Sequence, residues 1–330
     1  MPVDGIIPQP GAPAVDRSVL HSPQMRIDRG LRGKLRWHLN AAFTRRTALL
    51  NAFGARLTVV DAYGAPGDTL LTAIICRHVR QRRPRLRINC LTPNPELLRY
   101  DPNIDTLNAP EDFFSVWSWY PNLAGRRDAK SNILSETLGR LGWPFRREDY
   151  RARVYLTDEE RARGAQLLDC ADRPVITVST RTKEPTKNWP EEAWHDLLAE
   201  LAGRFHFVQL GDAREPQLEG VQRLAGRLSM RESMSVLSHA KIHVGGDSFL
   251  MHAANGLDVP SVIIFGGART PANLGYSENL NLYSAVPCSP CWLHESKGER
   301  CAYCMFCMNR IGVGDGRTAI ERLAAGIAAP

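Results

Sequence analysis

The stretch KIHVGGDSFLMHAANGLDVPSVIIFGG, residues Lys241 to Gly267, decides the fold expected for this chain. It reads as a strand over 240–244, a sharp turn at Gly245-Gly246 and a helix over 249–256. A second strand follows over 261–265, and its residues are almost all apolar, as in strands that are buried on both faces of a parallel sheet. The pattern therefore predicts an α/β fold.

The turn inside this stretch is typical of a phosphate site. Asp247 and Ser248 can cap the helix, and the N-terminus of a helix directs free N–H groups and a positive dipole end at one spot. The Ser248 hydroxyl and the His252 imidazole are expected near that spot. We therefore predict that Asp247, Ser248 and His252 bind an anionic group.

Residues 247–266, DSFLMHAANGLDVPSVIIFG, resemble the diphosphate-binding motif of the family 9 glycosyltransferases, the bacterial heptosyltransferases that use ADP-heptose. With two further stretches, the resemblance covers about 57–311. It implies a GT-B fold, in which two Rossmann-like, doubly wound domains face each other across a cleft, and an inverting transfer that needs no divalent ion. One position departs from the family, since Phe249 stands where a glycine usually follows the Asp-Ser pair. A phenyl group there is expected to narrow or block the donor site.

The second stretch that carries the resemblance begins with a strand over 57–62, a turn over 63–68 and a helix over 69–81. The sequence GDTLL in this turn matches the family's N-terminal signature, in which the aspartate is the general base. Carried over to this chain, that residue is Asp68. A carboxylate suits the role because the attacking hydroxyl must lose a proton, but an aspartate at this position can also simply cap the helix.

The third stretch is a buried strand over 175–180, followed by a loop that ends in Lys187-Asn188-Trp189-Pro190. In the family, the lysine of K-x-W-P neutralises charge on the departing diphosphate, which makes Lys187 a second catalytic residue. The alternative is a solvated loop lysine, with Lys183 as the spare candidate for the phosphate role. Ser179 and Thr180, at the end of the strand, complete this part of the predicted donor site.

Two other positions are assigned to the donor. Met230 begins the helix expected to end at His239, where a family loop lies against the nucleobase. Arg269 follows a strand, at the strand end where ligands of open α/β sheets bind. Either Arg269 or Thr270 can reach a phosphate or a sugar hydroxyl, although both are also ordinary loop residues.

Composition is that of a globular protein. Of the 330 residues, 43% are hydrophobic and 23% are charged, which allows two domains of ordinary size. No stretch predicts a membrane span or a signal peptide, so we expect a cytoplasmic location. The net charge of +7 suits phosphorylated substrates or an anionic membrane, and the absence of nucleic-acid recognition motifs argues against a nucleic-acid partner.

The N-terminal extension is basic. Residues 1–16 are rich in proline and glycine and are expected to be disordered, whereas 17–56 hold nine lysines or arginines and one acid. Apolar residues at helical spacing over 31–50 predict an amphipathic helix. This helix either packs on the domain or forms a surface for a peripheral contact with the inner membrane or for a partner.

Five of the eight cysteines lie within twenty residues and form C-x2-C-x9-C-x2-C-x2-C. Two C-x-x-C knuckles in a cytoplasmic chain predict a four-thiolate metal site rather than disulfides. Because a mononuclear site needs four thiolates, one is spare. The predicted ligands are Cys288, Cys291, Cys304 and Cys307, with Cys301 as the alternative to Cys304. Thiolates accept both iron and zinc, and the run is incomplete for an iron–sulfur cluster.

The knuckle CSPCW and the closing cysteine before Ile311 are similar to a branch of family 9, the bacterial autotransporter heptosyltransferases. These enzymes carry a ferric iron finger, form ring-shaped oligomers and glycosylate autotransporter adhesins before secretion. The resemblance implies a homo-oligomer whose iron, or alternatively zinc, stabilises the finger over 287–311 and takes no part in catalysis.

Together these patterns predict an extension over 1–50, an acceptor domain over 51–172 with Asp68, and a nucleotide-sugar domain over 173–330 that includes the finger. The expected activity is transfer of heptose from ADP-heptose to an autotransporter protein or a lipopolysaccharide-type acceptor. The alternative is a catalytically degenerate, iron-binding homologue that acts as a docking or polar-localisation factor for an autotransporter. Phe249, the cysteine cluster and the basic extension motivate this alternative.

Overall fold

The computed structural model describes residues 47–169, 173–293 and 299–327. The chain divides into two compact units, one formed by 1–123 and 133–155 and the other by 124–132 and 156–330. The expected helix over 31–50 falls largely outside the described residues, as do residues 170–172, where the sequence places the domain boundary. Within the described residues, no helix is both long enough and apolar enough to cross a membrane.

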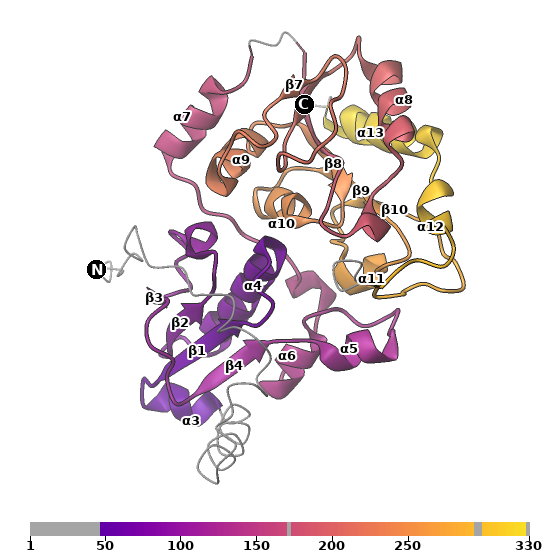
Figure 1. The fold of residues 1–330 in the computed structure, drawn as a ribbon. Helices are drawn as coiled ribbons and strands as arrows, with labels where there is room; N and C mark the ends of the chain where they lie inside the picture. Colours follow the sequence, from indigo (N-terminus) through magenta and orange to yellow (C-terminus); the bar gives the residue numbers. More distant parts are fainter. Residues whose placement is uncertain (1–46, 170–172, 294–298, 328–330) are drawn as a thin grey trace. The chain divides into compact units, whose positions relative to one another are not determined.

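The first unit is built on a four-stranded parallel sheet with the strand order β3-β2-β1-β4 (Figure 1). Its strands are β1 (Arg56–Asp61), β2 (Arg87–Leu91), β3 (Thr106–Leu107) and β4 (Ser115–Ser118). Its helices are α3 (Thr47–Ala52), α4 (Pro66–Arg82) and α6 (Ser135–Arg140), and α5 (Pro121–Arg126) leads into the segment that belongs to the second unit. Because β1 pairs with both β2 and β4, the strand order reverses beside β1.

The second unit contains a six-stranded parallel sheet with the order β10-β9-β8-β5-β6-β7. Its strands are β5 (Val175–Ser179), β6 (His206–Gln209), β7 (Gln222–Arg223), β8 (Ile242–Gly246), β9 (Ser261–Phe265) and β10 (Leu280–Tyr283). Its helices are α7 (Asp158–Gln166), α8 (Glu191–Leu201), α9 (Met230–Leu237), α10 (Phe249–Gly256), α11 (Pro271–Leu274), α12 (Phe306–Asn309) and α13 (Val313–Ile327). The order reverses between β5 and β8, which is where ligands of such sheets bind.

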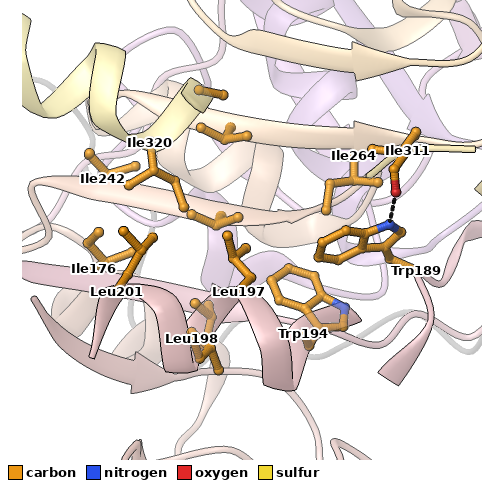
Figure 2. Packing of buried hydrophobic residues seen from close by; sticks show 14 of the residues in the cluster. Ile176, Trp189, Trp194, Leu197, Leu198, Leu201, Ile242, Ile264, Ile311 and Ile320 are labelled. Atoms are coloured by element: carbon orange, nitrogen blue, oxygen red, sulfur yellow. Dashed lines mark hydrogen bonds between the residues drawn. The ribbon is translucent and has the colours of Figure 1, made fainter. Parts of the chain in front are cut away.

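The core of the second unit lies between this sheet and helices α8 and α13 (Figure 2). Alternate residues of the strands, such as Ile176, Ile242 and Ile264, meet apolar residues of the helices, such as Leu197 and Ile320, as the two-residue period of a strand requires. The buried α/β pattern expected over 240–265 is thus confirmed. The helix over 249–256 and the strand over 261–265 have the expected bounds.

Two details of the central stretch differ from the sequence-based expectation. Gly245 and Gly246 are still part of β8, and neither has a positive φ, so they form no sharp turn. Instead, the lack of a side chain lets neighbouring atoms come close to these glycines. A Cβ on Gly245 would lie 2.6 Å from the Ser179 Oγ, and one on Gly246 would lie 3.2 Å from the Lys187 carbonyl oxygen. The glycines therefore let the end of β5 and the loop after it pack directly against β8.

Candidate phosphate site of the second unit

The loop after β5 and the start of α10 meet where the strand order reverses. The Lys187 Nζ lies 2.8 Å from the Asp247 Oδ2, and both side chains are largely buried. Burial opposes ionisation of Asp247, but the charges of Lys187 and Arg269 outweigh it and hold its pKa below the usual value. The site thus contains an ionised carboxylate close to two cations.

Trp189 fixes the loop that carries Lys187. Its ring lies in the core against Trp194, and its Nε1 donates a hydrogen bond of 2.9 Å to the Ile311 carbonyl oxygen (Figure 2). The backbone N–H of Lys187 donates to the Glu184 carbonyl oxygen. The tryptophan of the K-x-W-P sequence is therefore an anchor, and the lysine two residues earlier is held beside β8.

Ser248 occupies the N-cap position of α10, but its side chain makes no capping hydrogen bond. The expectation that Asp247 and Ser248 cap this helix is therefore wrong, because Asp247 is paired with Lys187 and Ser248 does not turn back onto the helix. The Ser248 Oγ is buried without a hydrogen-bond partner among the described residues. A buried hydroxyl without a partner is costly, and a ligand at this helix start would supply one.

His252 lies one turn further along α10 and is buried. Its Nδ1 is 2.8 Å from the Tyr276 hydroxyl, and the two rings pack edge to face. Burial lowers the pKa of His252 to about 4. The positive charge of Lys187 also lowers it, whereas the negative charge of Asp247 raises it. The imidazole is therefore neutral near pH 7, and Tyr276, which the sequence did not single out, sets its orientation.

Arg269 follows β9 and is also buried. Its guanidinium carbon lies 3.7 Å from the centroid of the Trp292 ring, and its Nη1 donates to the Ala268 carbonyl oxygen. Thr270 serves a different purpose, since it caps the short helix α11 and donates to the Ala129 carbonyl oxygen. The sequence left a choice between Arg269 and Thr270. Of the two, it is Arg269 whose charge interacts with the Asp247 carboxylate.

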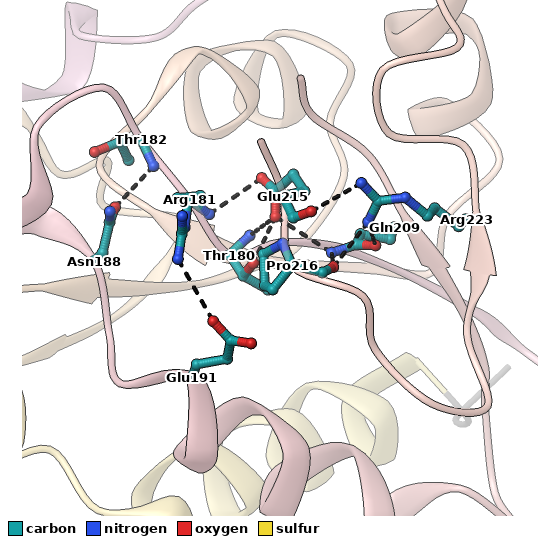
Figure 3. A network of polar contacts seen from close by, with 9 residues as sticks. All are labelled: Thr180, Arg181, Thr182, Asn188, Glu191, Gln209, Glu215, Pro216 and Arg223. Atoms are coloured by element: carbon teal, nitrogen blue, oxygen red, sulfur yellow. Dashed lines mark hydrogen bonds and ion pairs between the residues drawn. The ribbon is translucent and has the colours of Figure 1, made fainter. Parts of the chain in front are cut away.

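The buried carboxylate of Glu215 holds the start of the loop after β5 through hydrogen bonds (Figure 3). Glu215 accepts hydrogen bonds from the Thr180 N–H at 2.9 Å, the Thr180 hydroxyl at 2.5 Å and the Arg181 N–H at 3.1 Å. Burial raises the pKa of Glu215 despite these hydrogen bonds. The Thr180 hydroxyl already donates to Glu215, so towards a ligand it can act only as an acceptor.

The other predicted donor residues have simpler surroundings. The Ser179 hydroxyl faces Gly245 at the end of β5, Met230 is the first residue of α9 and is half-buried, and Phe249 is the half-buried first residue of α10. Lys183, the alternative to Lys187, is exposed. The structure thus brings Lys187, Asp247, His252 and Arg269 into one electrostatic group.

Asp68 belongs to the first unit and lies in the first turn of α4 rather than at its cap, which is Ala65. One of its carboxylate oxygens, Oδ1, accepts a hydrogen bond of 2.9 Å from the Tyr120 hydroxyl. The Tyr120 ring lies 4.3 Å, centroid to centroid, from the ring of the exposed Tyr63. The alternative interpretation of Asp68 as a mere helix cap therefore fails.

Asp61, at the end of β1, holds the turn that leads to Asp68. It accepts hydrogen bonds from the hydroxyls of Thr69 and Thr92 and from the Gly64 N–H, at 2.6, 2.9 and 2.8 Å. Burial raises the pKa of this carboxyl, against the opposing effect of these donors. Its position at the end of a buried strand is the only sequence signal that pointed to it.

The cysteine segment packs against the loop after β9. The Cys291 N–H donates to the Gly267 carbonyl oxygen at 2.8 Å, and a Cβ on Gly267 would lie 3.1 Å from the Cys307 Sγ. Burial raises the pKa of Cys291, and the neighbouring Cys288 and Cys307 thiols add to that rise. Three of the predicted ligands are therefore close enough to interact.

Of the other two cysteines of this segment, Cys304 is exposed, whereas Cys301 is half-buried like Cys288 and Cys291. Within the described ranges, no group of three or more Cys, His, Asp or Glu side chains has an arrangement that could hold a metal ion. The four-thiolate finger predicted from the spacing is therefore not assembled in this structure, although residues 294–298, between the knuckles, lie outside the description.

Comparison with known proteins identifies the family. The model of glycosyltransferase family 9 (heptosyltransferase) matches residues 136–301, which is half of the chain. The chain belongs to family 9. This match contains the loop with Lys187, the start of α10 and Arg269, so the candidate phosphate site lies within the matched residues.

A curated relative supports the family 9 assignment. Lipopolysaccharide heptosyltransferase 1 of Pseudomonas aeruginosa is 33% identical over 141 residues, which are 38% of this chain and 39% of the relative. The chain therefore spans about two fifths of the length of this relative.

Solved family 9 structures show the GT-B fold. The iron-containing dodecameric glycosyltransferase TibC of enterotoxigenic Escherichia coli aligns with a TM-score of 0.63 and 16% identity over 83% of this chain and 76% of its own. The E. coli heptosyltransferase WaaC with ADP aligns with a TM-score of 0.55 and 13% identity over 81% of this chain and 99% of its own. At such identities the likeness shows the fold alone.

Proposed function

We propose that this protein is an inverting glycosyltransferase that moves a heptose from ADP-heptose to an acceptor hydroxyl. The observation that carries the proposal is the buried group of Lys187, Asp247 and Arg269 at the strand-order reversal of the second sheet. Ligands of parallel α/β sheets bind at such a point. A neighbour in fold, TibC, has been solved in complex with ADP-D-β-D-heptose, which supports this choice of donor.

The charges of the site suit a diphosphate. Lys187 and Arg269 contribute two positive charges, Asp247 contributes one negative charge, and His252 is neutral because its pKa is about 4. The group therefore carries one net positive charge in a largely buried setting, where a charge acts more strongly than in water. The Ser248 hydroxyl and the uncapped start of α10 add hydrogen-bond donors for the phosphate oxygens.

In the proposed reaction, the acceptor oxygen attacks the anomeric carbon while the bond from that carbon to the phosphate oxygen breaks. The proton of the acceptor hydroxyl passes to Asp68, whose carboxylate is oriented by Tyr120. ADP departs with the electron pair of the broken bond, and Lys187 and Arg269 stabilise the charge that develops on it. No divalent ion is required for these steps.

The acceptor is proposed to be a hydroxyl of a lipopolysaccharide-type glycan or of an autotransporter protein. The name of the relative from Pseudomonas aeruginosa supports the first class. Homo-oligomerisation is proposed by analogy with the dodecameric TibC. The cytoplasmic location and the peripheral membrane contact remain predictions, and residues 1–46 of the basic extension lie outside the described residues.

We also propose that the cysteine segment binds one structural metal ion, iron or alternatively zinc, through Cys288, Cys291, Cys307 and one of Cys301 and Cys304. The proximity of the first three thiols and the iron in TibC support this proposal. Within the described residues no three of these side chains are arranged to hold an ion, so loading requires movement of the cysteine segment. The ion would fix the segment that packs against Gly267 and is assigned no part in the transfer.

The test is isothermal titration of the full chain with ADP-heptose, followed by a transfer assay with heptose-deficient lipopolysaccharide and with an autotransporter passenger domain. Binding by the natural protein, lost in Lys187→Ala, supports the transferase. Binding that appears only in Phe249→Gly would instead support the non-catalytic docking role, because the phenyl group stands at the first position of α10.

A further inference from the structure

Trp292, in the cysteine segment, contacts the candidate phosphate site. This residue directly follows Cys291 and is buried, with 6% of its surface exposed. Its ring covers the guanidinium of Arg269, whose carbon lies 3.7 Å from the ring centroid. Arg269, which is proposed to bind the donor phosphates, thus stacks on a ring from a part of the chain that is assigned no role in donor binding.

The contact is built into the backbone on both sides. The Ala268 carbonyl oxygen accepts a hydrogen bond from the Trp292 N–H at 3.2 Å and another from the Arg269 Nη1 at 2.9 Å. One carbonyl therefore holds both partners of the stack. The Cys291 N–H adds a bond of 2.8 Å to the Gly267 carbonyl oxygen, which aligns the two segments over consecutive residues.

A second part of the cysteine segment supports the same loop. A Cβ on Gly266 would lie 2.6 Å from the Met308 Sδ, and Cys307 approaches Gly267 in the same way. Met308 and Cys307 are buried in the core of the second unit. The loop that carries Arg269 is therefore held between the 288–292 segment and the 305–308 segment and has little freedom to move.

We infer that Trp292 is a positioning residue for donor binding, which holds the Arg269 guanidinium in the orientation that receives the donor diphosphate. An arginine side chain has many rotamers. Holding it in one rotamer before the ligand binds lowers the entropic cost of forming the complex. The face of an indole attracts a guanidinium and fixes the plane in which its N–H groups lie. The charge of Arg269 interacts with the Asp247 carboxylate. The stack on Trp292 therefore orients one of the charged side chains of the site.

This inference rests on the proposed function, since it assumes that Arg269 meets the donor diphosphate. The probe is ADP, titrated calorimetrically into the full chain. We expect Trp292→Ala to weaken ADP binding about threefold to thirtyfold, the range spanned by cation–π contacts. Trp292→Phe keeps an aromatic face and should restore affinity to within about threefold of the natural protein.

The deciding measurement is a double-mutant cycle. If Trp292 acts through Arg269, then Trp292→Ala adds no loss of affinity to Arg269→Ala. Arg269→Lys keeps the charge but loses the planar group, and it should resemble Trp292→Ala. Trp143→Ala, which removes a ring that stacks with Arg82 and Arg83 in the first unit, is the matched control and should leave ADP affinity unchanged.

The outcomes separate the two proposals. Equal losses from Trp292→Ala in the natural and the Arg269→Ala backgrounds would overturn the positioning role, as would unchanged affinity in both Trp292→Ala and Arg269→Lys. If Trp292→Ala does not fold, Trp292→Phe and Arg269→Lys still decide the question. Failure of the natural protein to bind either ADP or ADP-heptose would count against the proposed function itself.

Discussion

Lys187 and Asp247 form a buried ion pair, with Nζ 2.8 Å from Oδ2, across the point where the second sheet reverses its strand order. Lys187 stands at the end of the loop after β5 and Asp247 directly after β8, so sixty residues separate them in the sequence. The pair joins the two halves of the doubly wound sheet. It also places the lysine that we assign to the diphosphate beside a carboxylate that balances its charge.

The first prediction concerns the energy of this pair. Lys187→Met leaves the Asp247 carboxylate buried without its nearest cation and should cost about 3–5 kcal/mol of unfolding free energy. Asp247→Asn removes the buried charge and should cost less, about 1–3 kcal/mol. Urea unfolding measures both. Glu191→Gln, which removes the exposed pair with Arg181, is the control and should change stability by less than about 1 kcal/mol.

The ion pair also makes the stability of the folded protein depend on pH under acidic conditions. Because the pKa of Asp247 is lower in the folded protein than in the unfolded chain, its contribution is fully present above about pH 4 and is lost as the pH falls through the folded value. Asp247→Asn should lack this part of the acid response. A Lys187→Met variant as stable as Glu191→Gln would show that the pair contributes nothing.

The second prediction concerns Glu215, which accepts hydrogen bonds from Thr180, from the Arg181 N–H and, at 3.4 Å, from the Gln209 Nε2. Glu215→Gln places an amide group against at least one N–H donor and should destabilise the protein by about 1–3 kcal/mol. Since burial raises the pKa of Glu215, the natural protein binds this proton more tightly when folded. It should therefore lose stability as the pH rises from about 4.5 through the folded value, and the variant should not.

Thermal unfolding of the two proteins between pH 4 and pH 8 measures this effect. The stability difference between the natural protein and Glu215→Gln should narrow as the pH rises. A difference that widens would mean that the hydrogen bonds outweigh burial and that the pKa is lowered instead. Glu219→Gln, a few residues along the same loop, is a suitable control because Glu219 is exposed.

The sequence predicted the parts of this fold that depend on local pattern. Strand β9 and helix α10 have the expected bounds because apolar runs and helical spacing are local properties. The capping box of α7, with Thr157 and Glu160, is likewise local, because four consecutive residues form it. The family motifs pointed to Lys187 and Asp247, and the end of strand β9 pointed to Arg269; in the structure these three interact.

The partners of the site residues could not be predicted in this way. Glu215 reaches Thr180 from 35 residues away, Tyr276 reaches His252 from 24 residues away, and Trp292 lies over Arg269. Each contact depends on which strands are neighbours, and no local pattern encodes that. The glycines of β8 were misinterpreted for the same reason, because their role is to admit side chains and backbone from the loop after β5.

The third prediction tests the proposed base. Asp68→Asn should lower kcat by about 10²–10⁴-fold and leave the affinity for ADP unchanged, because a general base acts on the acceptor hydroxyl in the transition state. Tyr120→Phe removes the hydrogen bond to the Asp68 Oδ1 and should have a smaller effect, within about tenfold. Asp149→Asn, which alters the ion pair with Arg82 in the same unit, is the control. Full kcat in Asp68→Asn would assign the proton transfer to another group.

The fourth prediction concerns the metal. Elemental analysis of the purified protein should find about one iron or zinc ion per chain, and Cys288→Ser, Cys291→Ser and Cys307→Ser should each abolish it. Of Cys301→Ser and Cys304→Ser, only one should lose the ion, which identifies the fourth ligand. Cys76→Ser, which alters a buried thiol in the first unit, is the control and should keep the ion.

The physical reason is the burial of Cys291 beside Cys288 and Cys307, which raises its pKa and makes a metal-free thiolate unfavourable there. A cation reverses that effect, since a coordinating thiol is deprotonated by the ion, so the ion and the protons compete for the same sulfur atoms. Metal content should therefore fall as the pH is lowered. A protein that contains no metal, or that keeps it in both Cys291→Ser and Cys307→Ser, would show that these knuckles serve only to pack against Gly266 and Gly267.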